Sequence, residues 1–161
     1  GRILDFGKSR ESFRKDFALR EILDDLALLL RLKLEQSHVR LSMNEIPRDV
    51  MVYVDKGQLQ QALLNLILNA LAAMPEGGDL MIEASREREG KVQILVKDTG
   101  FGIPGDLRDR IFESFLSGRA EGAGLGLAIS KRILRGHDGD LELVESGTEG
   151  TLFRLTLPAP G

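Results

Sequence analysis

Three groups of residues in this sequence have the types and spacing of a ligand-binding site. The first is Gln61, Asn65 and Asn69, which recur every four residues and therefore share one face of a predicted helix. Asparagine is a poor helix former, so two amides one turn apart indicate a use other than packing. Amide oxygens suit a Mg²⁺ ion that keeps several waters and bridges nucleotide phosphates. The alternative is a solvated helix face whose amides bond to one another.

The second group is a glycine loop that comes after a predicted strand at 92–96. It reads Asp98-Thr99-Gly100-Phe101-Gly102, and Asp98 stands where the strand ends. A carboxylate there can accept a hydrogen bond from the exocyclic amine of adenine, whereas guanine would present a carbonyl and be repelled. The alternative is a plain Asp-Gly turn.

This loop also contains a look-alike of a dinucleotide-binding fingerprint. Gly100, Gly102 and Gly105 match GxGxxG, and Glu121 lies roughly 20 residues further along. The fingerprint must open a helix directly and lead to a second parallel strand. Pro104 interrupts the loop, and residues 106–121 contain no strand-like run. We therefore reject a dinucleotide site.

The third group consists of glycines at alternate positions, Gly122, Gly124 and Gly126, that run into a predicted helix. Bare backbone amides and the positive end of a helix dipole suit phosphate. No P-loop motif occurs in the sequence. A flexible helix entry is the alternative, but the three groups together supply the parts of a Mg-ATP site.

Composition limits the class of protein. The chain has 161 residues, of which 42% are hydrophobic, and a net charge of −3. These values indicate one globular domain and argue against nucleic-acid binding. The absence of cysteine excludes disulfides and thiolate sites. Apolar runs of at most five residues are too short to span a membrane.

Hydrophobic periodicity predicts helices and strands that would position these groups. Paired strands between helices favour an α/β (α+β) two-layer sandwich, with one mixed, mostly antiparallel sheet and three main helices on one face. The predicted helices are 18–36, 55–74 and 124–135, with a short helix and a loop in 106–123. The predicted strands are 39–43, 51–53, 80–85, 92–96, 141–143 and 152–157.

Five motifs in order resemble one known family, the histidine-kinase catalytic and ATP-binding domain of the GHKL superfamily, which has the Bergerat fold. The resemblance is greatest to sensor kinases of the nitrogen-regulation type. The motifs are the N box at 61–74, the first glycine box at 98–104, the F box at 111–115, the second glycine box at 122–129 and the Gly-Thr strand at 149–158.

The resemblance implies a role for individual residues. Asn69 would be the Mg²⁺ ligand, with Asn65 close to the metal and phosphates. Asp98 would bind the adenine amine, assisted through water by Thr151. Asn65 and Arg119 would be the catalytic residues, Arg119 facing the γ-phosphate from an ATP lid at 114–123. The remaining nucleotide contacts would be Gly100, Gly102, Gly122, Gly124, Leu125 and Gly126.

Two departures from the family pattern bear on the reaction. Related ATPases carry a Glu as general base where this chain has Asn65, which cannot take a proton. This favours phosphoryl transfer to an imidazole over ATP hydrolysis. Many sensor kinases also have a Lys shortly after the metal-binding Asn, but Ala72 and Ala73 stand here. Charge neutralisation would then depend on Arg119 and Mg²⁺.

The resemblance also implies partners. His38 and His137 lack the acidic context of a phosphoacceptor, and His137 is expected to be structural. The acceptor would lie on a dimerisation domain whose tail and linker form residues 1–14, with the ATP-binding domain at 15–161. A response regulator would act downstream. We expect a cytoplasmic location and no contact with membrane or nucleic acid. The alternatives are a GHKL-type ATPase and a non-catalytic nucleotide-binding module.

Overall fold

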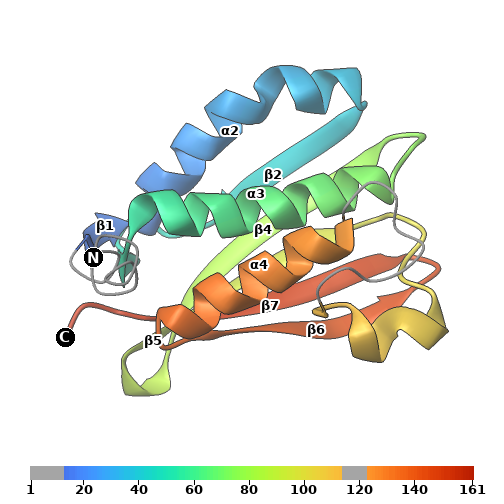
Figure 1. Cartoon of the computed structure of the whole chain (residues 1–161). Helices are drawn as coiled ribbons and strands as arrows, with labels where there is room; N and C mark the ends of the chain where they lie inside the picture. The colour runs from blue at the N-terminus through green and yellow to red at the C-terminus, as the bar shows by residue number, and fades with distance from the viewer. Residues whose placement is uncertain (1–12, 114–122) are drawn as a thin grey trace, which may run out of the picture.

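A computed structural model describes residues 13–113 and 123–161 of the chain. The described elements form two sheets and three long helices (Figure 1). The strands are β1 (Lys15–Ala18), β2 (Val39–Glu45), β3 (Met51–Val54), β4 (Gly78–Glu87), β5 (Lys91–Asp98), β6 (Asp140–Gly147) and β7 (Gly150–Pro158). The helices are α2 (Leu19–Gln36), α3 (Lys56–Ala72) and α4 (Ala123–Gly136), with short 3₁₀ turns η1 (Arg88–Gly90) and η2 (Gly105–Arg110).

The main sheet has five strands in the order β2-β4-β5-β7-β6. β2 pairs with β4 in parallel, and the other three pairings are antiparallel. The three long helices cover one face of this sheet, and α3 lies between α2 and α4 (Figure 1). The predicted two-layer sandwich with helices on one face is therefore confirmed.

Alternation along the strands explains this layering. Every second residue of β4, β5 and β7 is buried toward the helices, which present apolar stripes to the sheet. Burying one such Leu or Ile side chain contributes about 2 kcal/mol. Fully buried members of the core include Leu23, Leu59, Leu63, Leu66, Leu80, Ile82, Ile94, Leu134, Leu141 and Leu155.

The start of α3 agrees with its predicted capping signal. The Asp55 carboxylate accepts a hydrogen bond from the Gln58 backbone amide at 3.1 Å, as an N-cap residue should. The Asp55 backbone amide donates to His137 Nε2 at 3.1 Å. This second bond ties the first turn of α3 to the end of α4.

The expected pairing of the first two strands is wrong. The paired-strand pattern predicts a hairpin of 39–43 and 51–53 in the main sheet, but β3 pairs with β1 in a separate two-stranded sheet. The sequence pattern predicts no strand at β1. β2 pairs instead with the more distant β4. This pairing is parallel, and the long connection that parallel strands need contains β3 and α3.

The dinucleotide look-alike is excluded by the elements that come after it in the chain. Gly105 begins the 3₁₀ turn η2 rather than an α-helix, and the next described strand, β6, does not pair with β5, because β7 lies between them. No helix among residues 13–113 and 123–161 is long and apolar enough to cross a membrane.

Candidate functional site

The polar residues at the end of β5 form what we call the sheet-end cluster: Asp98, Gly100, Gly102, Ser146 and Thr151. Asp98 is the last residue of β5 and lies in register between Leu80 of β4 and Thr151 of β7. Its side chain is 4% exposed, although a carboxylate is rarely buried without a use. Its Oδ1 atom accepts a hydrogen bond from the Gly100 backbone amide at 2.8 Å.

Burial raises the pKa of Asp98 above its ordinary value of 3.8. Hydrogen bonds from the backbone amides of Gly100 and Thr151 oppose this shift but do not cancel it. Among the described residues, the hydrogen bonds to the Asp98 carboxylate come from backbone amides alone, so it retains acceptor capacity for a ligand amine.

Two hydroxyl groups continue the cluster from Asp98 across β7 to β6. Thr151 is 3% exposed, and its Oγ1 atom lies 2.8 Å from Ser146 Oγ. Ser146 Oγ also accepts the backbone amide of Ile103 at 2.8 Å. Ser146 is not among the predicted residues. What identifies it is the β6–β7 pairing, which places it opposite Thr151. These contacts attach the glycine loop to the hairpin.

The first glycine loop is closely packed against its neighbours. A Cβ atom on Gly100 would lie 2.5 Å from the Ala73 carbonyl oxygen, at the end of α3. Gly102 has φ +83°, and a Cβ there would lie 2.3 Å from the Gly147 carbonyl oxygen. Both positions therefore require glycine even without a ligand.

The second set, which we call the helix-face cluster, consists of Gln61, Asn65 and Asn69 on α3 and Gly126 on α4. The predicted shared face is present, and all three amides are exposed or half-buried. Gln61 Nε2 donates to Asn65 Oδ1 at 3.0 Å, and Asn65 Nδ2 donates to the Gly126 carbonyl oxygen at 3.1 Å. In the described part of the chain, the Asn69 side chain has no hydrogen-bond partner.

The helix-face cluster fits a metal only with the help of a ligand. Among residues 13–113 and 123–161, no group of three or more His, Cys, Asp or Glu side chains could hold a metal ion. The donor set of this cluster is neutral amide oxygen. Such a set suits Mg²⁺ that takes its remaining ligands from phosphates and water.

Several predicted residues lie outside the described part of the chain. These include Arg119, Gly122 and most of the expected lid, as well as Phe115 of the F box. The backbone of Gly124 and Leu125 belongs to the first turn of α4. In the rest of the F box, Ile111 is buried and the Phe112 ring packs edge-on against Phe153 at 6.2 Å between centroids.

The two histidines are expected to be unsuitable as phosphoacceptors. His137 is buried, and its Nδ1 atom lies 2.9 Å from the Ile133 carbonyl oxygen while Nε2 accepts the Asp55 amide. Both ring nitrogens are occupied, so the expected structural role of His137 is confirmed. Burial lowers the pKa of His137 below 6.5.

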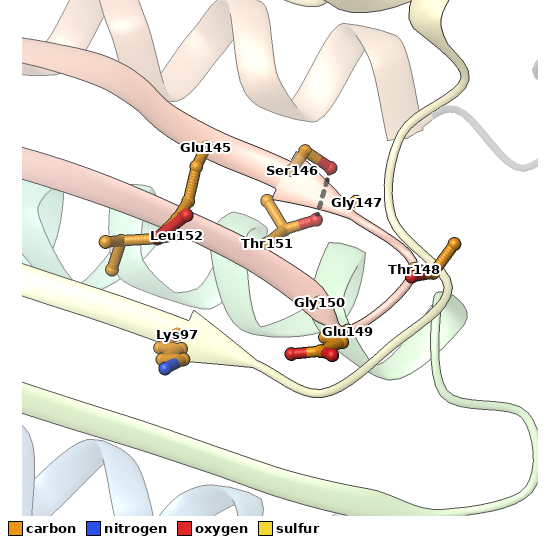
Figure 2. Close-up of a pocket in the computed structure, with 9 residues that line it drawn as sticks. All are labelled: Lys97, Glu145, Ser146, Gly147, Thr148, Glu149, Gly150, Thr151 and Leu152. Atoms are coloured by element: carbon orange, nitrogen blue, oxygen red, sulfur yellow. Dashed lines mark hydrogen bonds between the residues drawn. The ribbon is translucent and has the colours of Figure 1, made fainter.

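A cavity of about 320 Å³ lies on the opposite side of the sheet from the helices (Figure 2). Its lining residues Lys97 and Leu152 are register partners that alternate with the buried Val96 and Phe153, so they face away from α3 and α4. The cavity also runs along residues 145–151 of the β6–β7 hairpin. Ser146 and Thr151 of the sheet-end cluster contribute to its lining, whereas no described residue of α3 or α4 does.

Comparison with known proteins gives consistent matches. A family model described as "Histidine kinase-, DNA gyrase B-, and HSP90-like ATPase" matches residues 54–161. Sporulation kinase C of Bacillus subtilis (strain 168) is 36% identical over 145 residues, which cover 89% of this chain and 34% of that protein. The chain thus spans about a third or less of the length of the first curated relatives.

Two solved histidine-kinase structures match this chain over most of its length. The catalytic domain of histidine kinase ThkA in a nucleotide-free form has a TM-score of 0.82 and 28% identity, covering 91% of this chain and 95% of that chain. Full-length ShkA in complex with AMPPNP has a TM-score of 0.78 and 30% identity, covering 92% of this chain and 32% of that chain.

Proposed function

Because this chain belongs to the family of histidine kinase-, DNA gyrase B- and HSP90-like ATPases, we propose that it binds Mg-ATP and positions the γ-phosphate for transfer to a histidine. The acceptor histidine would be on the dimerisation domain of a sensor kinase, and a response regulator would receive the phosphoryl group later. The observation that carries the ATP site is the buried Asp98 at the end of β5, which is not paired with a cation in the described structure.

In this proposal, the sheet-end cluster recognises the adenine base of ATP. Asp98 accepts a hydrogen bond from the adenine amine, and Thr151 supports the same edge of the base through water. Gly100 and Gly102 would let the loop backbone pass close to the nucleotide, while Ala73 and Gly147 occupy the space on the side where a Cβ would stand. The backbone bonds that orient Asp98 are already made, so little reorganisation is needed on binding.

The helix-face cluster would face the phosphates. The Asn69 amide has no hydrogen-bond partner among residues 13–113 and 123–161, and Asn69 is the proposed Mg²⁺ ligand; the ion would neutralise charge on the phosphates when bound. Gly126 stands in the first turn of α4, where backbone amides point toward an anion. Gly122, Gly124, Leu125 and Arg119 complete the proposed phosphate contacts.

The residue one turn before Asn69 bears on the reaction class. Asn65 cannot accept a proton, so this position offers no general base to activate water. A neutral imidazole needs no such base because its nitrogen already has a free lone pair. This favours transfer to histidine over a GHKL-type ATPase. A chain that binds nucleotide without catalysis is the other candidate, and a phosphotransfer assay separates the two.

Calorimetry with a non-hydrolysable ATP analogue tests the binding site. We expect wild-type protein to bind the analogue more tightly with Mg²⁺ than without it, and Asp98→Asn to weaken binding strongly. No binding by the wild type, or binding that Asp98→Asn leaves unchanged, would overturn the ATP site.

Mixing this domain with a separately prepared dimerisation domain and labelled ATP tests the transfer. We expect an acid-labile, base-stable labelled product on the dimerisation domain. An acid-stable product, or steady hydrolysis by this domain alone at about 1 per second or more, would contradict phosphotransfer to histidine. We also propose that the site works in the cytoplasm, where ATP is available.

A further inference from the structure

Side-chain-to-backbone hydrogen bonds tie α3 to α4 at three levels. The two helices run antiparallel, and each bond joins a polar group of one helix or its cap to the other helix or its end. The middle bond involves a serine hydroxyl that is fully buried. The bonds are Asn65 Nδ2 to the Gly126 carbonyl at 3.1 Å, Ser130 Oγ to the Ala62 carbonyl at 2.9 Å, and the Asp55 amide to His137 Nε2 at 3.1 Å.

The bond nearest the second glycine motif comes from Asn65. Both polar ends of its side chain are engaged, since Oδ1 accepts from Gln61 while Nδ2 donates to Gly126. A carbonyl oxygen has two lone pairs, so Gly126 can accept this bond in addition to a helical one. An ideal Cβ on Gly126 would lie 3.6 Å from both Cβ and Cγ of Asn65, so the two residues are also in packing contact.

Asn69, one turn later, differs from Asn65. Its side chain has no hydrogen-bond partner among the described residues, although it lies on the same face of α3. Two asparagines with the same sequence signature therefore have different environments. One contacts the backbone of the neighbouring helix, and the other is left available to a ligand.

We propose that Asn65 is a positioning residue that fixes the first turn of α4 through the Gly126 carbonyl, and that it is not a ligand of Mg²⁺. This inference rests on the proposed function for its effect on nucleotide, because the first turn of α4 is where the phosphates are expected. Its effect on α4 itself does not depend on any ligand.

Four variants separate positioning from ligation; one of them, Asn69→Ala, removes the proposed Mg²⁺ ligand. Asn65→Ala removes the donor, and alanine is a better helix former than asparagine, so α3 is not weakened. Asn65→Asp keeps the shape and an oxygen that Mg²⁺ would accept, but it cannot donate to the Gly126 carbonyl. Gln61→Ala is the matched control, because it removes an amide from the same face and leaves the Asn65–Gly126 bond.

The first measurement is amide hydrogen exchange over residues 123–130 in the ligand-free chain. Both Asn65 variants should exchange about fivefold faster than wild type, the effect of losing one neutral hydrogen bond. Gln61→Ala and Asn69→Ala should match wild type. Wild-type exchange in Asn65→Ala or in Asn65→Asp would overturn the proposal.

The second measurement is calorimetry with adenosine and with a non-hydrolysable ATP analogue over a range of Mg²⁺ concentrations. Asn65→Ala should weaken the triphosphate about fivefold, leave adenosine unchanged and keep the Mg²⁺ dependence. Asn69→Ala should lose the Mg²⁺ dependence. If Asn65→Ala loses it too, or if Asn65→Asp strengthens it, Asn65 is a ligand and the proposal fails. If wild type binds no nucleotide, the proposed function fails while the exchange result still decides the role of Asn65.

Discussion

The sheet-end cluster and the helix-face cluster are built in different ways. In the sheet-end cluster, Asp98 and Thr151 are almost fully buried and hydrogen-bonded, and Gly100 and Gly102 have no room for a side chain. In the helix-face cluster, the amides are exposed or half-buried, and Gly126 has room for a methyl group. The geometry of the sheet-end cluster is determined by strand pairing in the sheet. The geometry of the helix-face cluster is determined by the packing of α3 against α4.

This difference fits the proposed reaction. The adenine of ATP is the same before and after phosphoryl transfer, so its site can be preformed. The phosphates change, so their site must accept a metal ion and a loop, and then release a diphosphate. Substitutions in and around each cluster test this contrast, and the most damaging one comes first.

Gly102→Ala should lower the free energy of unfolding by about 3 kcal/mol, because it combines a positive φ with a backbone clash. Urea denaturation followed by circular dichroism measures this loss. The control is Gly105→Ala, where a Cβ would meet nothing within 4 Å, and its stability should stay within about 0.5 kcal/mol of wild type. If the two variants are equally stable, the sheet-end cluster is not rigid.

Asp98→Asn should weaken binding of a non-hydrolysable ATP analogue by about 2–3 kcal/mol, or roughly 30- to 150-fold, because a charged acceptor is lost. The variant should nevertheless unfold no more easily at neutral pH, since it removes a buried charge while the amide oxygen can still accept the Gly100 amide. Calorimetry and denaturation at pH 7 measure the two effects. Asp106→Asn, on the exposed turn η2, is the control for both.

The pH dependence of Asp98 has a defined sign. Its pKa is raised in the folded state, so the native protein binds a proton more readily than the unfolded chain between pH 3.8 and the raised value. Wild-type stability should therefore fall as pH rises through this window. Asp98→Asn should lack that contribution, and an unchanged slope in the variant would contradict the assignment.

His137→Asn should lower stability by about 1–2 kcal/mol at pH 8, because the Asp55 amide loses its acceptor. Since the pKa of His137 is lowered in the folded state, wild-type stability should be complete above pH 6.5 and fall as pH drops from 6.5 toward the lowered value. Denaturation between pH 5 and pH 8 tests this. His38→Asn, on the exposed turn before β2, is the matched histidine-to-asparagine control.

Gly126→Ala should have the smallest effect on stability and is expected to raise it by about 0.5–1 kcal/mol, because alanine favours helix and its Cβ has room. It should also weaken the ATP analogue by less than about tenfold if phosphates approach this backbone. Gly136→Ala at the other end of α4 is the matched control and should leave affinity unchanged. Equal affinity in Gly126→Ala would argue against phosphate contact here.

Much of the fold could be predicted because it depends on local patterns. Alternation predicted β4, apolar residues next to glycines predicted β5 and β7, and the Asp55 cap predicted the start of α3. The partner of β2 could not be predicted in this way, since pairing across α3 depends on contacts distant in sequence. β1 was missed because a four-residue strand with two exposed residues has no clear periodicity.

The candidate site was predicted as a set of residue types but not as a set of contacts. The spacing of Asn65 and Asn69 predicted a shared face, but only the position of α4 distinguishes the two amides. Ser146 was missed because a single serine in a hairpin has no motif around it. Its role depends on the β6–β7 register, which places it against Thr151.

The contact between Arg14 and α4 has a mechanical consequence. The Arg14 guanidinium donates to the Gly136 carbonyl and pairs with Asp138 at 3.5 Å, and the strand that begins after it is fixed to β3. Gly136 and Gly126 are ten residues apart, or about 15 Å along the helix axis. A force applied to the chain just before Arg14 would therefore act on the C-terminal end of α4, the helix whose first turn contains Gly126.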